Sequence, residues 1–401
     1  MMKNAGTNIS FDGLGIAPKT LEMLDRLKFT HPTPIQYKAI PIAINGTDII
    51  GVAQTGTGKT LAFAIPVVQR LSPNKGKCLV LVPTRELALQ VNETFRKIAP
   101  LFGIKTAVII GGVPIRSQMN DLKRNPRVII ATPGRLVDHM HQKTMRLNDV
   151  EILILDEADR MLDMGFKPDI ERILKFVPKN RQTMLFSATI PGAIMSIGAA
   201  HMKLPVHIEV APSGTAAERI IQELFIVRKE TKKELLGKLL NQYSGSVLLF
   251  ARTKRGAGKI NRLIKGMGHN SAEIHSDRTL AQRREALEGF KRGKYRILVA
   301  TDIAARGIDV VGIETVINYD IPDDAENYVH RIGRTGRAGH EGRAISFATP
   351  EQGKEIRSIE NIIKTALPIS EHPEIPREKF RSQTVFQSRN WNSLRKSRRR
   401  R

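Results

Sequence analysis

A glycine-rich stretch over residues 53–60, Ala-Gln-Thr-Gly-Thr-Gly-Lys-Thr, has the residue types of a phosphate-binding loop. The apolar run before it predicts a buried parallel strand, and the apolar spacing after it predicts a helix. Glycines in such a loop let backbone N–H groups converge on an anion, and the helix N-terminus adds its partial positive charge. Lys59 can reach the outer phosphates of a nucleotide, and the Thr60 hydroxyl can bind Mg²⁺. We therefore predict a phosphate site formed by Thr55, Gly56, Thr57, Gly58, Lys59 and Thr60.

One departure from the usual motif leaves an alternative open. The usual motif begins with glycine, whereas this chain has Ala53 there, so the stretch could be a glycine-rich turn that happens to precede a lysine. A second Gly-Lys pair, Gly258-Lys259, lacks a following Ser or Thr, and we expect it to begin a helix instead.

Two adjacent carboxylates, Asp156 and Glu157, follow the apolar residues 151–155. An aspartate at the end of a strand can bind Mg²⁺, usually through water, and the adjacent glutamate can orient or deprotonate an attacking water. Beside a phosphate loop this pair predicts nucleotide hydrolysis, although a lone Asp-Glu pair is usually a solvated helix start. His139 and His141 face apart on a helix, so we expect solvated histidines rather than a metal pair.

The elements that position these residues alternate between apolar strands and helical patterns, which predicts a doubly wound parallel sheet. The polar motifs follow the strands, and ligands of such sheets bind at the carboxyl ends of the strands. The expected strands of the first half are residues 48–53, 78–82, 106–110, 128–131, 151–155 and 183–186.

A small, polar segment over residues 210–219, broken by Pro and Gly, is typical of a linker. The second series of strands behind it has no phosphate loop, so one nucleotide must serve two domains. Its expected strands are residues 221–227, 247–250, 296–300, 315–318 and 344–347.

A segment of the second half, residues 330–339, combines arginines with glycines. Arginines on such a segment can reach across a cleft and neutralise a transferring phosphoryl group, a contribution of about 10³–10⁵ in rate. The alternative is a basic loop that binds phosphate nonspecifically.

The composition points to a polyanionic partner. The 401 residues include 64 Lys and Arg against 39 Asp and Glu, a net charge of +25, which favours nucleic acid first and an anionic membrane surface second. No apolar run is long enough to span a bilayer, and no signal peptide is recognisable. The single cysteine, Cys78, fits a reducing cytosol and a packing role. Aromatic residues make up only 5%, so we expect recognition of the nucleic-acid backbone rather than stacking on bases.

With these motifs in this order, residues 11–349 resemble the DEAD-box RNA helicases, most closely the bacterial RhlE type. The resemblance implies an α/β fold of two tandem RecA-like domains, over residues 1–209 and 220–367. It implies a cytoplasmic ATP-dependent RNA helicase that uses ATP and Mg²⁺. RNA-stimulated hydrolysis in the interdomain cleft would be coupled to local unwinding or remodelling of short duplexes and RNA–protein complexes, with little sequence specificity.

The resemblance also implies roles at the nucleotide. An aromatic and a glutamine held on a proline-rich turn can recognise adenine, although a helix-capping turn is the simpler alternative for that stretch alone. Adenine would be recognised by Phe29 and Gln36, with Phe11 packing behind them. The catalytic residues would be Lys59, Asp156, Glu157 and the fingers Arg334 and Arg337. Mg²⁺ would be bound by Thr60 and Asp156, the ribose by Asp302, and Asp309 would orient a finger.

A further set of residues would bind RNA and couple it to the nucleotide. Coupling is implied for Asp159, Ser187, Thr189 and His330. RNA contacts are implied for Pro83, Thr84, Arg85, Gly111, Gly112, Thr132, Pro133, Gly134, Arg135, Arg252, Thr253, Arg283 and Thr301.

The chain departs from the family pattern at two places. Lys28 stands where the family often has glycine, and Leu280 stands where it has glutamine, although the arginine three residues later, Arg283, is present. The second departure puts RNA contact at that segment in doubt.

We expect residues 368–401 to form a disordered basic tail, because prolines break regular structure there. Residues 371–401 carry ten Lys and Arg against three Glu, a net charge of +7. Such a tail would tether RNA electrostatically and could dock ribosomal or mRNA-decay assemblies, or it could only improve solubility.

Two rival functions remain. A DNA helicase or translocase of the same superfamily is disfavoured by the Asp-Glu-Ala-Asp tetrad and the adenine motif. A non-catalytic RNA clamp is disfavoured because a clamp has no use for the hydrolytic Glu157.

Overall fold

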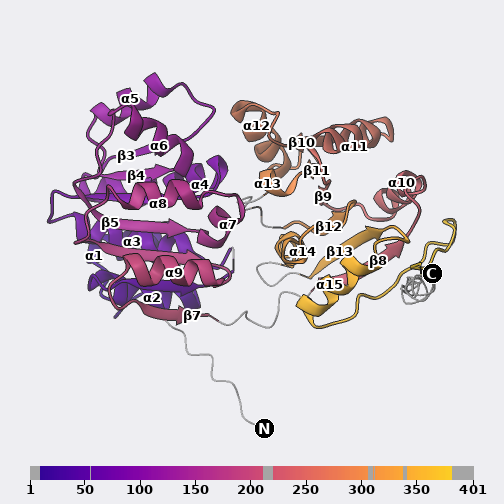
Figure 1. The fold of residues 1–401 in the computed structure, drawn as a ribbon, viewed down its shortest axis with the longest axis horizontal. Helices are drawn as coiled ribbons and strands as arrows, with labels where there is room; N and C mark the ends of the chain where they lie inside the picture. The colour runs from indigo at the N-terminus through magenta and orange to yellow at the C-terminus, as the bar shows by residue number, and fades with distance from the viewer. Residues whose placement is uncertain are drawn as a thin grey trace, which may run out of the picture.

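The computed structural model describes residues 10–54, 56–210, 220–305, 310, 312–336 and 341–381. They form two α/β domains that lie side by side, the first in indigo to magenta and the second in red to yellow (Figure 1). Each domain has one parallel sheet with helices on both faces, as the alternation of strands and helices predicted.

The first sheet has seven parallel strands in the order β3-β4-β2-β5-β6-β1-β7. Alternate residues of a strand enter the two halves of the core: Val80 belongs to the cluster that contains Phe63, and Leu79 belongs to the cluster that contains Ile170. The strands are β1 Ile49–Val52, β2 Lys77–Leu81, β3 Thr106–Ile109, β4 Val128–Ala131, β5 Val150–Asp156, β6 Gln182–Ser187 and β7 Val206–Glu209. The helices are α1 Pro18–Arg26, α2 Pro34–Ile44, α3 Lys59–Leu71, α4 Arg85–Ile98, α5 Ile115–Lys123, α6 Pro133–His141, α7 Ala158–Asp163, α8 Lys167–Leu174 and α9 Gly192–His201, with a 3₁₀ turn at Ala99–Phe102.

The second sheet has six parallel strands in the order β10-β11-β9-β12-β13-β8. Leu249 and Leu248 again enter opposite halves of the core. The strands are β8 Ile220–Ile226, β9 Val247–Phe250, β10 Ser271–Ile274, β11 Ile297–Ala300, β12 Thr315–Asn318 and β13 Gly342–Ala348. The helices are α10 Lys232–Gln242, α11 Lys254–Gly266, α12 Leu280–Lys291, α13 Asp302–Ala305, α14 Ala325–Ile332 and α15 Gly353–Ile363.

The predicted strands are all confirmed, with boundaries within two residues, but β7 and β10 were missed. Both are edge strands of four residues. β7 buries only Ile208, and β10 includes the polar Ser271 and Glu273, so neither has the apolar run of a central strand. The Gly258-Lys259 pair is helical, as predicted, but it does not begin the helix, because α11 begins at Lys254.

Two expectations about single side chains have different outcomes. Cys78 is fully buried, as a packing residue should be, and burial raises its pKa. The prediction of a solvated His139 is wrong: its ring is buried between Thr144 Oγ1 at 2.8 Å and Gln118 Oε1 at 3.1 Å. His141 is exposed, and no metal-binding cluster of three or more His, Cys, Asp or Glu occurs in the described part of the chain.

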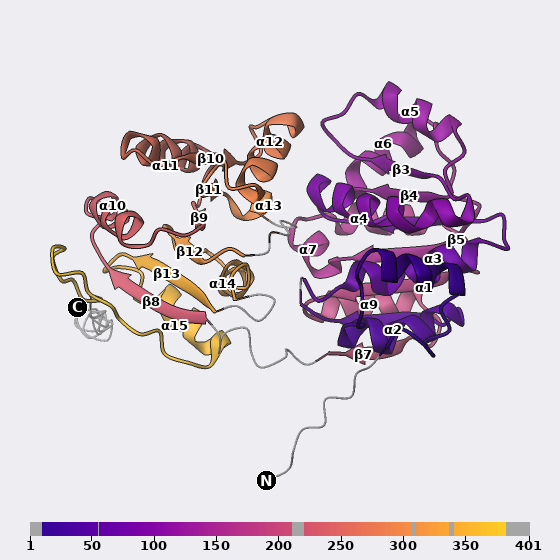
Figure 2. The ribbon, with the colours of Figure 1, turned by 180° about the vertical axis from the view of Figure 1, so that it is seen from behind.

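The prediction of a disordered tail is wrong for residues 368–381. Leu224 N–H donates to Pro368 O at 2.9 Å, Ser370 N–H donates to Leu224 O at 2.8 Å, and Ile375 is buried in the core. The physical reason is that β8 is a sheet edge, whose unpaired backbone groups an extended segment can satisfy. This strap, residues 368–381, runs along the side of the second domain away from the first (Figures 1 and 2).

The charge of the expected tail is divided accordingly. Residues 371–381 carry three Lys and Arg and three Glu, so the whole +7 belongs to residues 382–401, which lie outside the described residues. Most of the predicted linker, residues 211–219, also lies outside them. Among the described helices, none is long and apolar enough to cross a membrane.

Candidate active site between the two domains

The predicted phosphate loop is shaped by glycines in a left-handed conformation. Gly56 has φ 83° and Gly58 has φ 87°, a region that favours glycine. A Cβ atom on Gly58 would also lie 2.4 Å from Gln36 Nε2, so a larger residue would displace the Gln36 amide in addition to straining the backbone. Helix α3 begins directly after Gly58, at Lys59, as a phosphate loop requires.

The lysine of the loop is buried and held in place. Lys59 Nζ donates to Ala53 O at 2.8 Å. Its charge acts on Asp156, at the end of β5, and lowers the pKa of that carboxyl, but burial acts more strongly and raises it to about 7. Asp156 and Thr60 offer the hard oxygen ligands that Mg²⁺ prefers, and a cation would favour the ionised form of this buried carboxylate. The donor set therefore fits Mg²⁺.

Glu157 occupies a strained position between β5 and α7. Its backbone has φ 53° and ψ 50°, and its N–H donates to Asp156 Oδ1 at 3.0 Å. A non-glycine residue in the left-handed region costs free energy and is found where surrounding contacts enforce it. The strain turns the chain directly into α7, so that the buried Glu157 and the arginine three residues later lie on the same side of the turn.

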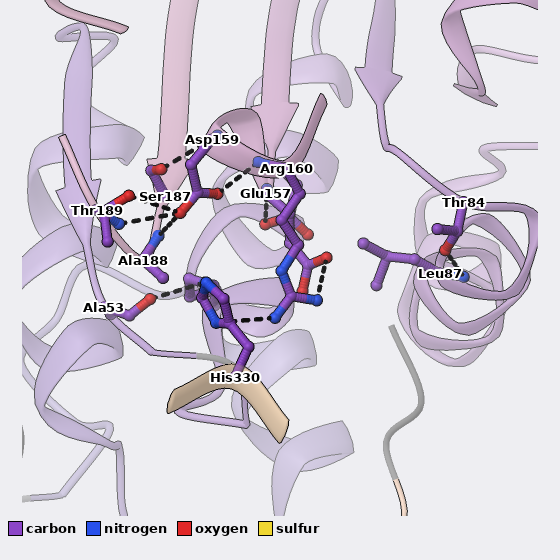
Figure 3. A network of polar contacts seen from close by, with 12 residues as sticks. Ala53, Thr84, Leu87, Glu157, Asp159, Arg160, Ser187, Ala188, Thr189 and His330 are labelled. Atoms are coloured by element: carbon purple, nitrogen blue, oxygen red, sulfur yellow. Dashed lines mark hydrogen bonds and ion pairs between the residues drawn. The ribbon is translucent and has the colours of Figure 1, made fainter. Parts of the chain in front are cut away.

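Asp159 ties the acidic tetrad to the segment after β6 (Figure 3). Its Oδ2 accepts from Ala188 N at 3.0 Å, Thr189 N at 3.0 Å and Thr189 Oγ1 at 3.2 Å, and its own N–H donates to Ser187 Oγ at 3.3 Å. Burial alone would raise the pKa of Asp159, but the charges of Lys59 and Arg160 and the backbone donors lower it. Three predicted coupling residues, Asp159, Ser187 and Thr189, are thus brought together.

The fourth coupling residue, His330, reaches this network from α14 of the second domain. Its Nδ1 lies 3.4 Å from Arg160 Nη2, and Arg160 Nη1 donates to Glu157 Oε2 at 3.1 Å (Figure 3). Burial, followed by the charge of Arg160, lowers the pKa of His330 to about 4. Arg160 was not among the predicted site residues, although an arginine three residues after Glu157 at a helix start is a signal for such a pair.

The adenine motif lies against the phosphate loop. Gln36 Nε2 donates to Gly58 O at 3.0 Å, and Gln36 Oε1 accepts from Thr33 N at 2.9 Å. The second contact is part of a capping box at the start of α2, so the capping alternative is confirmed, and adenine recognition stays a prediction. Phe11 is buried in the core, whereas Phe29 is 38% exposed.

In the second domain, Asp302 is held by Arg331, which was not among the predicted site residues. Arg331 Nε lies 2.6 Å from Asp302 Oδ1, and Arg331 Nη2 lies 2.7 Å from Oδ2. Arg331 Nη1 also donates to Asp320 O at 2.6 Å. Arg334 is buried just after α14. Outside the described residues lie Thr55, Asp309 and Arg337.

Most of the predicted RNA contacts line one cavity of about 380 Å³. The Arg85 guanidinium packs over Gly111 and Gly112, where a Cβ on Gly112 would lie 2.2 Å from Arg85 Nη1. The cavity is lined by Pro83, Thr84, Arg85, Gly111, Gly112, Thr132, Gly134, Arg135 and Arg283 among the predicted residues. Four predicted residues are not among its lining: Pro133, Arg252, Thr253 and Thr301.

Two residues of this second group have hydrogen-bond partners in loops or caps, and a third is buried. Arg252 N–H donates to Asp320 Oδ2 at 3.0 Å, Thr253 Oγ1 caps α11 by accepting from Gly256 N at 3.0 Å, and Thr301 is buried after β11. Thr84 likewise caps α4 through Leu87 N at 3.2 Å. These caps position the loops at the strand ends.

A second contact joins the domains between α4 and α12. Arg283 Nη2 lies 2.7 Å from Glu86 Oε2, and both side chains are buried. Burial raises the pKa of Glu86, and Arg283 acts against that rise. Leu280, which stands where the family has glutamine, packs against the core of the first domain. It lines a groove of about 570 Å³ together with Leu89.

Comparison with known proteins adds two family models. The model "DEAD/DEAH box helicase" matches residues 33–197, and "Helicase conserved C-terminal domain" matches residues 231–339. The chain is 44% identical to the ATP-dependent RNA helicase CshA of Listeria monocytogenes, over 88% of this chain and 69% of the relative. It is 43% identical to the ATP-dependent rRNA helicase RRP3 of Debaryomyces hansenii, over 91% of this chain and 77% of the relative.

Solved structures are similar in the arrangement of the two domains. Mss116p bound to ssRNA and AMP-PNP has a TM-score of 0.83 at 29% identity, covering 92% of this chain and 81% of that one. S. cerevisiae Dbp5 bound to RNA and ADP BeF3 has a TM-score of 0.79 at 31% identity, covering 90% and 95%. A DEAD box protein from Methanococcus jannaschii reaches only 0.53 at 37% identity, covering 90% and 99%.

Proposed function

The chain belongs to the DEAD/DEAH box helicase family, and on this premise we propose that it is an ATP-dependent RNA helicase whose ATP hydrolysis is stimulated by RNA. The observation that supports it most is the polar path from Thr189 through Asp159 and Arg160 to His330. It joins the nucleotide side of the first domain to the second domain. The higher TM-scores to RNA-bound and nucleotide-bound relatives support a closed arrangement of the domains.

For the nucleotide, Lys59, Thr60 and the loop N–H groups hold the phosphates, and Gln36 and Phe29 recognise adenine. Mg²⁺, held by Thr60 and Asp156, supplies charge neutralisation when bound. Glu157 orients the attacking water and accepts its proton.

The second domain completes the site. Arg334 and Arg337 stabilise the charge that develops on the transferred phosphoryl group, while Asp302, oriented by Arg331, faces the ribose. Hydrolysis therefore requires both domains, which is how RNA binding across them stimulates it.

RNA binds along the cavity between Arg85, Arg135 and Arg283 and the strand-end loops beside it. These groups suit phosphates, so recognition has little sequence preference. Closure around one strand is incompatible with a straight duplex, so a short duplex is unpaired locally. Finer assignments are also proposals: the RhlE-type subgroup, a cytoplasmic location supported by the single Cys78, and docking of ribosomal or mRNA-decay assemblies through residues 382–401.

The test is ATP hydrolysis with and without single-stranded RNA, in the wild type and in Glu157→Gln. We expect strong RNA stimulation, and a loss of about 10²–10⁴-fold in the variant with ATP binding retained, because the amide cannot accept the proton. Stimulation by DNA but not RNA would indicate a DNA helicase or translocase instead. RNA binding without hydrolysis under any condition would indicate a clamp.

A further inference from the structure

Arg160 is the largest fully buried side chain among the described residues, only 1% exposed. A guanidinium is always charged, and its burial is costly unless it is paired and hydrogen-bonded. Its contacts to side chains come from both domains: Glu157 Oε2 in the first, at 3.1 Å, and His330 Nδ1 in the second, at 3.4 Å. Figure 3 shows the guanidinium between the two.

The chemistry of the second contact is set by its partners. A guanidinium can only donate, so His330 Nδ1 must be the acceptor and the imidazole is neutral. Nη1 and Nη2 are the two ends of one planar, rigid fork. Where His330 lies therefore influences the plane of the guanidinium, and the plane of the guanidinium determines where it holds Glu157 Oε2.

On the proposed function, Glu157 must present its carboxylate to a water with well-defined geometry. The ion pair with Arg160 engages Oε2, and a carboxylate has lone pairs on a second oxygen that can accept from that water. His330 reaches Arg160 only when α14 of the second domain lies against α7. We propose that Arg160 is a positioning residue that orients Glu157 for hydrolysis when the two domains close, with His330 as its contact across the cleft.

A purely structural ion pair differs from this in one respect. It would neutralise Glu157 equally whether or not His330 is in contact, and its loss would appear as lower stability rather than slower hydrolysis. A positioning residue acts on kcat, because ATP and RNA are bound by other groups.

The test uses the full chain with Arg160→Met and Arg160→Lys, and Arg172→Met as the matched control. Arg172 is an exposed arginine of α8 that pairs only weakly, 3.5 Å from Asp169. Thermal midpoints, binding of a fluorescent ATP analogue, and kcat at saturating ATP and RNA are measured. We expect kcat to fall about 10²-fold in Arg160→Met, as for a misplaced catalytic group, with nucleotide affinity nearly unchanged and the control like wild type.

Arg160→Lys covers the case in which the methionine variant does not fold. Lysine keeps the positive charge beside Glu157 but lacks the planar fork, so its kcat should also be reduced while its thermal midpoint stays near that of wild type. Wild-type kcat in Arg160→Lys, with the fold intact, would overturn the proposal. So would an effect confined to KM.

The link to closure is tested by a double-mutant cycle with His330→Ala. If Arg160 acts through this contact, the losses in kcat from Arg160→Lys and His330→Ala should be clearly less than additive. Additive losses would overturn the interdomain part of the proposal. The proposed function fails separately, if the wild type itself has no RNA-stimulated hydrolysis.

Discussion

Single residues in the site carry strain or charge that their neighbours must offset. Glu157 and Lys28 both have left-handed backbones, at φ 53° and 61°. For Glu157 the strain serves the turn into α7. Lys28 ends α1 in a Schellman motif, with its own N–H donating to Asp25 O at 2.9 Å and Phe29 N–H donating to Leu24 O at 2.9 Å. The position favours glycine, which the family often has there.

Lys28→Gly should therefore stabilise the first domain. Glycine removes the left-handed strain, and part of that gain is lost to the entropy of the unfolded chain, so we expect the free energy of unfolding to rise by about 0.5–1 kcal/mol. Thermal denaturation followed by circular dichroism measures it. Lys28→Ala is the control, because alanine keeps the strain and should not stabilise. Equal midpoints for the glycine and alanine variants would refute this explanation.

At the scale of elements, α12 and the strap show how pieces of the second domain are held. The first turn of α12 is fixed by a capping box between Thr279 and Gln282, and it presents Leu280 and Arg283 to α4. The strap is fixed by edge pairing with β8 and by the burial of Ile375. One element is an interdomain contact and the other stabilises a single domain.

Leu280→Gln restores the family residue and should weaken the contact with the first domain. Loss of a half-buried apolar contact costs about 1 kcal/mol, so the RNA concentration for half-maximal ATPase should rise about fivefold. Leu204→Gln is the control, because Leu204 is 94% exposed and lies away from α4 and α12. A value like wild type in Leu280→Gln would show that this contact does not contribute to closure.

Ile375→Ala should destabilise the second domain by about 2–4 kcal/mol, because it leaves a cavity under β8 and β13. The midpoint of thermal or urea unfolding measures this. Deletion of residues 382–401 is the comparison, since it leaves the strap intact and should not change the midpoint.

If those residues tether RNA, the same deletion should weaken RNA binding and flatten its salt dependence, because it removes a net charge of +7.

At the scale of the whole molecule, the two domains meet at α7–α14 and at α4–α12, and each contact buries charge. Figures 1 and 2 show α7 and α14 facing each other from the two domains. At α7–α14 the buried charge is Arg160, which donates to a neutral His330. At α4–α12 the buried charges are Arg283 and Glu86, which form an ion pair. We therefore expect closure to depend on whether His330 at the first contact is protonated.

Lowering the pH from 7 to 5 should favour separation of the domains. Burial, then Arg160 and Arg334, lower the pKa of His330 from 6.5 to about 4, while Asp159 and Glu157 act the other way. If separation restores the ordinary pKa, the separated form binds more protons in this range, and the equilibrium shifts towards it by up to about 20-fold. Energy transfer between dyes on one engineered cysteine per domain measures this, since the native Cys78 is buried. His330→Gln should strongly reduce the dependence, leaving only what other groups such as Glu86 contribute. An unchanged dependence in that variant would exclude His330 as its source.

Local sequence determined the elements and the polar residues that follow each strand. The phosphate loop, Asp156, Glu157 and the central strands were predictable because each depends on neighbouring residues: glycines for a turn, an apolar run for a buried strand, and carboxylates directly after it. The strands β7 and β10 were not, because edge strands lack a long apolar run and form through pairing with a partner.

Only the tertiary structure decided which charged side chains, far apart in the sequence, form ion pairs or hydrogen bonds with one another. Arg160 between Glu157 and His330, Arg331 on Asp302, and Arg283 on Glu86 are pairs whose partners are set by packing of elements far apart in the chain. The strap was misjudged for the same reason, since its proline-rich sequence has no regular pattern of its own and becomes ordered on the edge of β8. An arginine in the sequence looks the same whether its side chain is exposed or buried. Its role follows from the groups that surround the guanidinium once it is buried.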